Sequence, residues 1–124
     1  MLGSNNAIAF VATTNAQASR QFYENVLGLR FIKDEHFALV FDLNGRMLRI
    51  FKIESLIPAT HTILGWDVED IEAMVDQLSN RGITFERLEG LEQDAKGIWR
   101  SPSGAHVAWF KDPDGNVLSL TQFA

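Results

Sequence analysis

The chain has 124 residues and no cysteine, and 46% of its residues are hydrophobic and 22% charged. This length suits one domain with its own core, and the lack of cysteine excludes disulfides, thiolate metal sites and cysteine nucleophiles. The net charge of −5 is uneven: residues 1–60 hold six basic and five acidic side chains (+1), and residues 61–124 hold five and eleven (−6). The sequence contains no stripe of basic residues, so we do not expect it to bind DNA or RNA.

We expect no targeting signal and no membrane-spanning segment at the start of this sequence. The longest unbroken apolar run is Ala7–Ala12, far shorter than the roughly 20 residues of a membrane-spanning helix. No basic stretch precedes this run, so it does not resemble a signal peptide. We expect a cytoplasmic protein without a membrane partner, and we interpret residues 1–6 as a short polar leader.

Two segments have the spacing of helices. The first runs from about Ala16 to Val26, with Asn15 as its N-cap and apolar residues at every fourth position. The second runs from about Ile71 to Arg81, with Asp70 as its N-cap. Its apolar stripe has the i, i+3, i+4, i+7 spacing of one helix face and consists of Ile71, Met74, Val75 and Leu78.

Eight short runs of β-branched, aromatic and aliphatic residues predict strands. They are Ala7–Ala12, Leu29–Lys33, Phe37–Phe41, Arg46–Lys52, Thr62–Val68, Ile83–Leu88, Ala105–Phe110 and Val117–Phe123. Asn44-Gly45 predicts a hairpin turn, and the DPDGN run at 112–116 predicts a second turn. The order is strand, helix and three strands, twice over, which predicts two βαβββ units at about 7–54 and 61–123.

A self-comparison supports this internal repeat. Ile8 and Ile63 each stand seven residues before the N-cap of their helix, and Phe41–Ile50 aligns with Phe110–Leu120 with one residue of slack. The alignment pairs Gly45 with Gly115, Leu48 with Leu118 and Arg49 with Ser119. The second unit is longer by a polar loop, roughly Glu89 to Ser103, which is typical of a ligand lid or of a mobile surface loop without a role.

Two motifs resemble a known family. They are Phe22–Leu29, with the sequence FYENVLGL, and Phe110–Asn116, with the sequence FKDPDGN. With the repeated units, they make the region from Ala7 to Phe123 similar to the vicinal oxygen chelate superfamily, which includes glyoxalase I, extradiol dioxygenases and bleomycin resistance proteins. The resemblance implies one α+β domain over 1–124, with two tandem curved mixed sheets that form a cleft, each with one helix on its outer face. It also implies a homodimer.

The same resemblance implies where a metal would bind. Enzymes of the superfamily place one ligand, usually His or Glu, on the first and last strands of each unit. Those positions fall here on Ile8, Arg49, Ile63 and Ser119. Isoleucine has no donor atom and arginine repels a cation, so we expect no metal and no cofactor. The alternative is a non-standard site that includes His61 and His106.

Strand alternation predicts which residues line the cleft. The inward set on the first unit is Ile8, Phe10, Met47, Arg49 and Phe51, and on the second it is Ile63, Gly65, Asp67, Ser119 and Thr121. The opposite faces, with Leu48, Ile50, Leu64, Trp66, Leu118 and Leu120, suit packing under the helices. An apolar, aromatic cleft with few polar groups predicts a small organic ligand. The predicted ligand-binding residues are Phe10, Met47, Arg49, Phe51, Asp67, Trp99, His106, Trp109 and Ser119.

Arg49 has three interpretations, because an inward guanidinium is costly unless it is paired. It pairs with an internal carboxylate such as Asp67, it binds an anionic or carbonyl ligand, or an error of register leaves it on the surface. Asp67 and Glu69 themselves suit a solvated strand end and capping region as well as a cleft.

Three hypotheses about function follow. The first is a metal-independent small-molecule binding protein of the bleomycin-resistance type. The second is a divergent lyase, epimerase or dioxygenase that uses the region of His61 and His106; we assign no catalytic residues. The third is an interaction or structural subunit whose cleft is filled by side chains. The fold alone does not decide between them.

Overall fold

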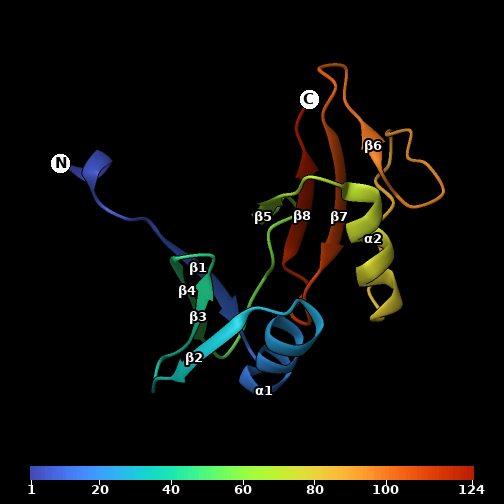
Figure 1. Cartoon of the computed structure of the whole chain (residues 1–124). Helices are drawn as coiled ribbons and strands as arrows, with labels where there is room; N and C mark the ends of the chain where they lie inside the picture. The colour runs from blue at the N-terminus through green and yellow to red at the C-terminus, as the bar shows by residue number, and fades with distance from the viewer. The chain divides into compact units, whose positions relative to one another are not determined.

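The computed structural model describes all 124 residues, and the chain divides into two compact units, Met1–Ile57 and Pro58–Ala124. Each unit holds a four-stranded mixed sheet with one helical segment (Figure 1). This confirms the predicted α+β fold of two tandem βαβββ units. No helix is long and apolar enough to cross a membrane.

The first unit follows the predicted order closely. After a short 3-10 turn, η1 (Leu2–Ser4), its elements are β1 (Ile8–Thr13), α1 (Ala16–Arg20), η2 (Gln21–Val26), β2 (Arg30–Asp34), β3 (Ala38–Leu43) and β4 (Arg46–Lys52). The strand order is β1-β4-β3-β2, with β1 parallel to β4 and the other pairs antiparallel. Asn44 and Gly45 both have positive φ, at 51° and 91°, as a tight hairpin turn requires.

The first predicted helix is present but is not uniform. The side chain of Asn15 accepts a hydrogen bond from the amide of Ala18 and caps α1. The segment η2 that continues it is a π-helix. At its end the amide of Leu27 donates to the carbonyl of Phe22, five residues back. Tyr23, on this wider turn, is fully buried and lies 6.1 Å from Phe41 between ring centroids.

One face of the first sheet packs under this helical segment. Leu48, Ile50 and Phe41 are completely buried, and Leu39 and Val11 are nearly so. All five lie on the same face, because the pairing sets Phe41 opposite Leu48, and sets both Leu39 and Val11 opposite Ile50. We call the other face of this sheet the first open face.

The second unit repeats this arrangement of strands and helix, but the edge strand that corresponds to β2 is shorter. Its elements are β5 (Thr62–Asp67), α2 (Ile71–Asn80), β6 (Trp99–Arg100), β7 (His106–Lys111) and β8 (Val117–Gln122), in the sheet order β5-β8-β7-β6. The side chain of Gln122 accepts a hydrogen bond from the amide of Ile71, which fixes the start of α2 against one face of the sheet. Leu118 and Leu120 are buried on that face. The opposite face is the second open face.

The strand predicted at Ile83–Leu88 is wrong. Within it, the amide of Glu86 donates to the carbonyl of Trp109, but no strand forms, and the edge strand is the two-residue β6. The side chain of Gln93 explains the difference. Its amide nitrogen donates to the carbonyl of Glu86 and its oxygen accepts from the amide of Leu88. Backbone groups that a ladder would pair are satisfied by this side chain.

Candidate functional site

The first open face carries the inward residues predicted for the first unit. Phe10 lies opposite Arg49, Ile8 opposite Met47, and Ala12 opposite Phe51, so their side chains share one face, as predicted. The exposed fractions are 58% for Phe10, 40% for Met47 and 37% for Phe51, whereas Leu48 and Ile50 on the other face are 0% exposed. The rings of Phe10 and Phe51 lie edge to face at 6.5 Å. This face is therefore apolar and accessible along β1 and β4, whereas Ala38 and Val40 of β3 on the same face are buried.

Arg49 lies among these apolar side chains and is ion-paired. Its Nη2 donates to Glu35 Oε1 at 2.7 Å, and Lys33 Nζ lies 3.1 Å from Glu35 Oε2. Of the three interpretations of Arg49, pairing with a carboxylate is therefore the one observed, and the partner is Glu35, from the loop after β2, rather than Asp67. The hydrogen bond from Arg49, followed by that from Lys33, holds the pKa of Glu35 below its ordinary value of 4.5. Only one terminal nitrogen of the guanidinium binds this carboxylate; Nη1 lies 4.0 Å from Met47 Sδ.

The second open face carries two indoles. Trp109 lies opposite Ser119, which lies opposite Gly65, and Trp99 lies opposite Val107. The rings of Trp99 and Trp109 are 6.1 Å apart and tilted by 37°. Ser119 is nearly buried. A Cβ on Gly65 would stand 3.0 Å from Ser119 Oγ, so the glycine makes room for that hydroxyl. Asp67 and Thr121 are opposite each other along the same face.

Two details of the second unit bear on which residues share its open face. The register between β5 and β8 shifts between Thr62 and Leu64. Exposure nevertheless alternates along β5, and Ile63, Gly65 and Asp67 are its exposed residues. On β7, His106 lies opposite Gln122, whose side chain binds the amide of Ile71 at the start of α2. His106 is therefore on the face of the sheet that packs against α2. His106 and Trp109 are both predicted ligand-binding residues, but they lie on opposite faces of β7, because they are an odd number of positions apart.

The donor atoms needed for a metal centre do not come together. No group of three or more His, Cys, Asp or Glu side chains could hold a metal ion. The positions that the family resemblance assigns to metal ligands hold Ile8, Arg49, Ile63 and Ser119. Of these, only the serine hydroxyl has an oxygen to offer, so this donor set does not fit a divalent cation.

A hollow of about 760 Å³ lies at one end of the second open face. Trp109, Lys111 and Val117 contribute to it from β7 and β8, and the segments 58–62 and 86–88 form its sides. Its volume falls in the range of about 300–1,000 Å³ that is usual for small-molecule sites. Lys111 Nζ lies 3.6 Å from Glu86 Oε1 in this hollow.

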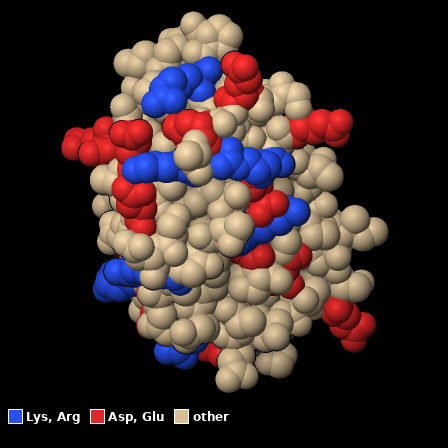
Figure 2. All heavy atoms as spheres, turned by 90° about the vertical axis from the view of Figure 1, so that its right-hand side faces the viewer, with Lys and Arg blue, Asp and Glu red and all other residues tan.

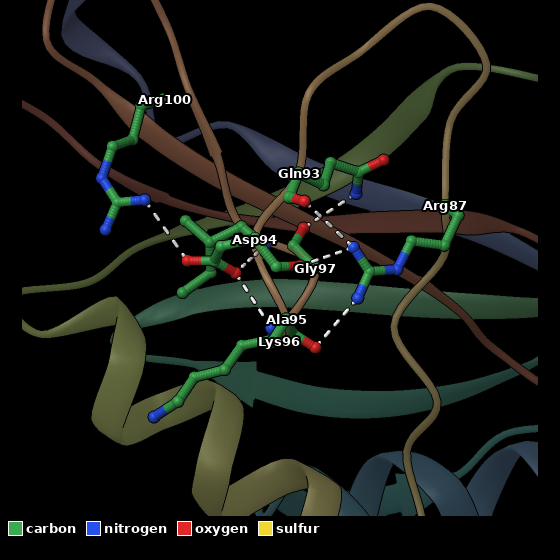
Figure 3. A network of polar contacts seen from close by, with 8 residues as sticks. Arg87, Gln93, Asp94, Ala95, Lys96, Gly97 and Arg100 are labelled. Carbon is green, nitrogen blue, oxygen red and sulfur yellow. Dashed lines mark hydrogen bonds and ion pairs between the residues drawn. The ribbon is translucent and has the colours of Figure 1, made fainter.

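The loop predicted at Glu89–Ser103 is closed by internal hydrogen bonds (Figure 3). The guanidinium of Arg87 donates to the carbonyls of Gln93, Asp94 and Ala95. The carboxylate of Asp94 accepts from the amides of Lys96 and Ile98 at 2.9 and 3.0 Å. This network favours a fixed support for Trp99 over either a mobile lid or a mobile loop.

The electrostatics of Asp94 are consistent with this closure. Burial alone would raise the pKa of Asp94, but the amides of Ile98 and Lys96 and the guanidinium of Arg100 together lower it. Sequence reasoning did not identify Arg87, Gln93 or Asp94. Their only signal in the sequence is a run of polar side chains in a glycine-rich loop, which is also typical of an exposed loop.

Figure 2 shows the charged side chains on one side of the molecule. On the side shown in Figure 2, basic and acidic side chains are interspersed, and no area carries basic side chains alone. Six of the seven ion pairs join side chains at 2.7–3.3 Å, and the exception is Lys111–Glu86 at 3.6 Å. Each open face therefore has a charged side chain close to apolar ones, Arg49 on the first and Lys111 on the second, and small-molecule sites commonly combine such groups.

Comparisons with known proteins agree with this architecture. Residues 6–120 match the model of the Glyoxalase/Bleomycin resistance protein/Dioxygenase superfamily. A putative glyoxalase family protein from Bacillus anthracis aligns with a TM-score of 0.75 at 16% identity, covering 98% of this chain and 96% of that one. A bleomycin resistance determinant encoded on the transposon Tn5 aligns at 0.74 with 21% identity (97% and 98% covered). A lactoylglutathione lyase from Agrobacterium tumefaciens aligns at 0.69 with 20% identity (96% and 93% covered). The chain belongs to the Glyoxalase/Bleomycin resistance protein/Dioxygenase superfamily.

Proposed function

We propose that this protein binds a small organic molecule on the open faces of its sheets, without a metal ion and without a chemical step. The observation that carries the proposal is the first open face. In the first sheet, Leu48 and Ile50 on the other face are completely buried, whereas Phe10, Met47 and Phe51 are between 37% and 58% exposed around a single arginine. Large apolar side chains gathered around one polar group are typical of ligand sites.

The roles of the site residues follow from their positions. Phe10, Met47 and Phe51 supply apolar area, and Arg49 supplies a donor for a carbonyl or anionic group. On the second open face, Trp99 and Trp109 supply rings for stacking, and Asp67 and Ser119 supply polar groups. His106 is not part of this proposal, because it lies on the other face of its sheet.

Metal independence is supported by the donor chemistry at the four positions discussed above. The similarity to a bleomycin resistance determinant supports a binding role, and the similarity to a lactoylglutathione lyase supports a catalytic one. The residues favour the first, because a metal site needs about three or four N or O donors and these positions supply one oxygen.

A thermal-shift assay on EDTA-treated protein tests this proposal. The panel contains 2-naphthoate, 2-naphthamide and 2-naphthylmethylamine, which share one ring system and differ in charge. We expect at least one compound to raise the melting temperature without added metal. Phe10→Ser should weaken binding on the first open face about tenfold or more, because burial of a phenylalanine side chain contributes about 1.5–3 kcal/mol.

Phe37→Ser is the matched control. Phe37 is even more exposed, at 74%, and lies in the loop between β2 and β3, outside the proposed site. Its substitution should leave ligand binding unchanged. Binding that appears only after a divalent metal is added, or that falls equally in both variants, would contradict the proposal.

A further inference from the structure

The hollow in the second unit has a charge balance opposite to that of its surroundings. Residues 61–124 have five basic and eleven acidic side chains, for −6. Two of the five basic residues, Arg87 and Lys111, line the hollow, but only one of the eleven acidic residues, Glu86, does so. A hollow with more cations than carboxylates in a strongly acidic half of the chain favours an anionic ligand.

Lys111 is the basic group in the hollow that remains available to a ligand. The guanidinium of Arg87 is occupied by the carbonyls of the neighbouring loop. Lys111 Nζ lies 3.6 Å from Glu86 Oε1, and its side chain is 52% exposed. This separation exceeds the 2.7–2.9 Å of a strong charge-assisted hydrogen bond, and Lys96 of the same unit binds Asp76 at 2.8 Å.

The remaining walls suit a flat, apolar body next to that charge. Trp109 lines the hollow together with the apolar residues Pro58, Leu88 and Val117. A carboxylate that reached Lys111 would leave the rest of a ligand against these side chains. Stacking on an indole favours a planar ring system.

We propose that the hollow takes a small aromatic monocarboxylate, with its anionic group on Lys111 and its ring against Trp109. The inference rests on the proposed function, since it names the ligand class that the second open face selects. Glu86 competes with the ligand for Lys111. The charge of Glu86 therefore tunes affinity for the carboxylate and has little effect on a neutral ligand of the same shape.

Isothermal titration of the full chain with 2-naphthoate and 2-naphthamide tests the inference, because the two probes have nearly the same shape and differ in charge. We expect the carboxylate to bind about tenfold more tightly, as a hydrogen bond to a charged group supplies. Lys111→Met should remove this preference by weakening only 2-naphthoate. Glu86→Gln should strengthen 2-naphthoate and leave 2-naphthamide unchanged.

Lys96→Met is the matched control, since it removes a cation of the same unit that does not line the hollow. It should retain the full preference for the carboxylate. Equal affinity for the two probes, failure of both to bind, or a preference that survives Lys111→Met, would overturn the inference. If 2-naphthamide still binds and Phe10→Ser weakens it, the proposed function stands although the inference has failed.

Discussion

Arg49 and Glu35 form an ion pair in the middle of an apolar surface. The pair satisfies a guanidinium that is only 25% exposed, and it leaves Arg49 Nη1 beside Met47. A monodentate pair of this kind gives up one partner more readily than a bidentate one. Arg49 can therefore serve both as a stable part of the sheet and as a donor to a ligand.

The pKa of Glu35 reports this interaction. Arg49→Met should raise it toward 4.5, because the largest cause of the lowered pKa, the hydrogen bond from Arg49, is removed while Lys33 remains. A carboxyl with a lowered folded-state pKa stabilises the fold above its unfolded pKa, and this contribution is lost as pH falls through the folded value. The variant should therefore lose less melting temperature than the wild type on acidification below 4.5. Side-chain ¹³C NMR titration of Glu35 measures the pKa, and an unchanged value would show that Arg49 does not bind it in solution.

At the scale of residues, the sequence predicted which side chains share a face of the first sheet, but not the ion-pair partner of Arg49. Alternation places Phe10, Met47, Arg49 and Phe51 together, because strand geometry has a period of two residues. It could not identify Glu35 as the partner of Arg49, since Glu35 lies in the loop after β2, and the pairing of β2 contains a register shift between Phe31 and Lys33. No local residue pattern in the sequence marks such a shift.

At the scale of elements, the loop that carries Trp99 is held by its backbone conformation as well as by polar side chains. Gly97 is buried with φ at +87°, and a Cβ there would stand 3.2 Å from Phe85 Cβ. Gly90 has nearly the same φ, +84°, but has nothing within 4 Å of such an atom. An alanine at Gly90 would therefore experience backbone strain alone, whereas an alanine at Gly97 would experience both backbone strain and steric crowding.

Gly97→Ala should destabilise the protein more than Gly90→Ala. Both alanines incur the cost of about 1–2 kcal/mol for a left-handed conformation, and only the first adds overpacking, typically about 1–3 kcal/mol. Denaturant unfolding measures both. Equal losses would show that the loop relaxes around an added methyl group and that Phe85 does not fix it.

The helices and most strands were predictable because their signals are local: caps, turns and periodicity. Asn15 and Asp70 both cap helices as expected, and Arg46–Lys52 has the bounds predicted. The segment 83–88 was not predictable in the same way. Its apolar pattern suits a strand, but the side chain of Gln93, from later in the chain, satisfies its backbone instead.

At the scale of the whole molecule, one supersecondary plan is used twice with different surfaces. The first unit presents exposed aromatic and aliphatic side chains around Arg49, and the second presents two indoles and a hollow lined by Lys111. The repeat was predictable because both units have a helix N-cap and a glycine-containing turn at corresponding positions. The surfaces diverge because residues on an open face do not have to fill a core, so the fold leaves their chemistry free.

The most direct test of the account is amide chemical-shift mapping of the EDTA-treated protein with 2-naphthoate and 2-naphthamide. We expect the shifts that either compound perturbs to gather on residues 8–12 and 46–52 of the first open face. We expect the shifts that only the carboxylate perturbs to gather around Trp109 and Lys111. Perturbations that appear only after a divalent metal is added, or that lie mainly outside both open faces, would contradict it.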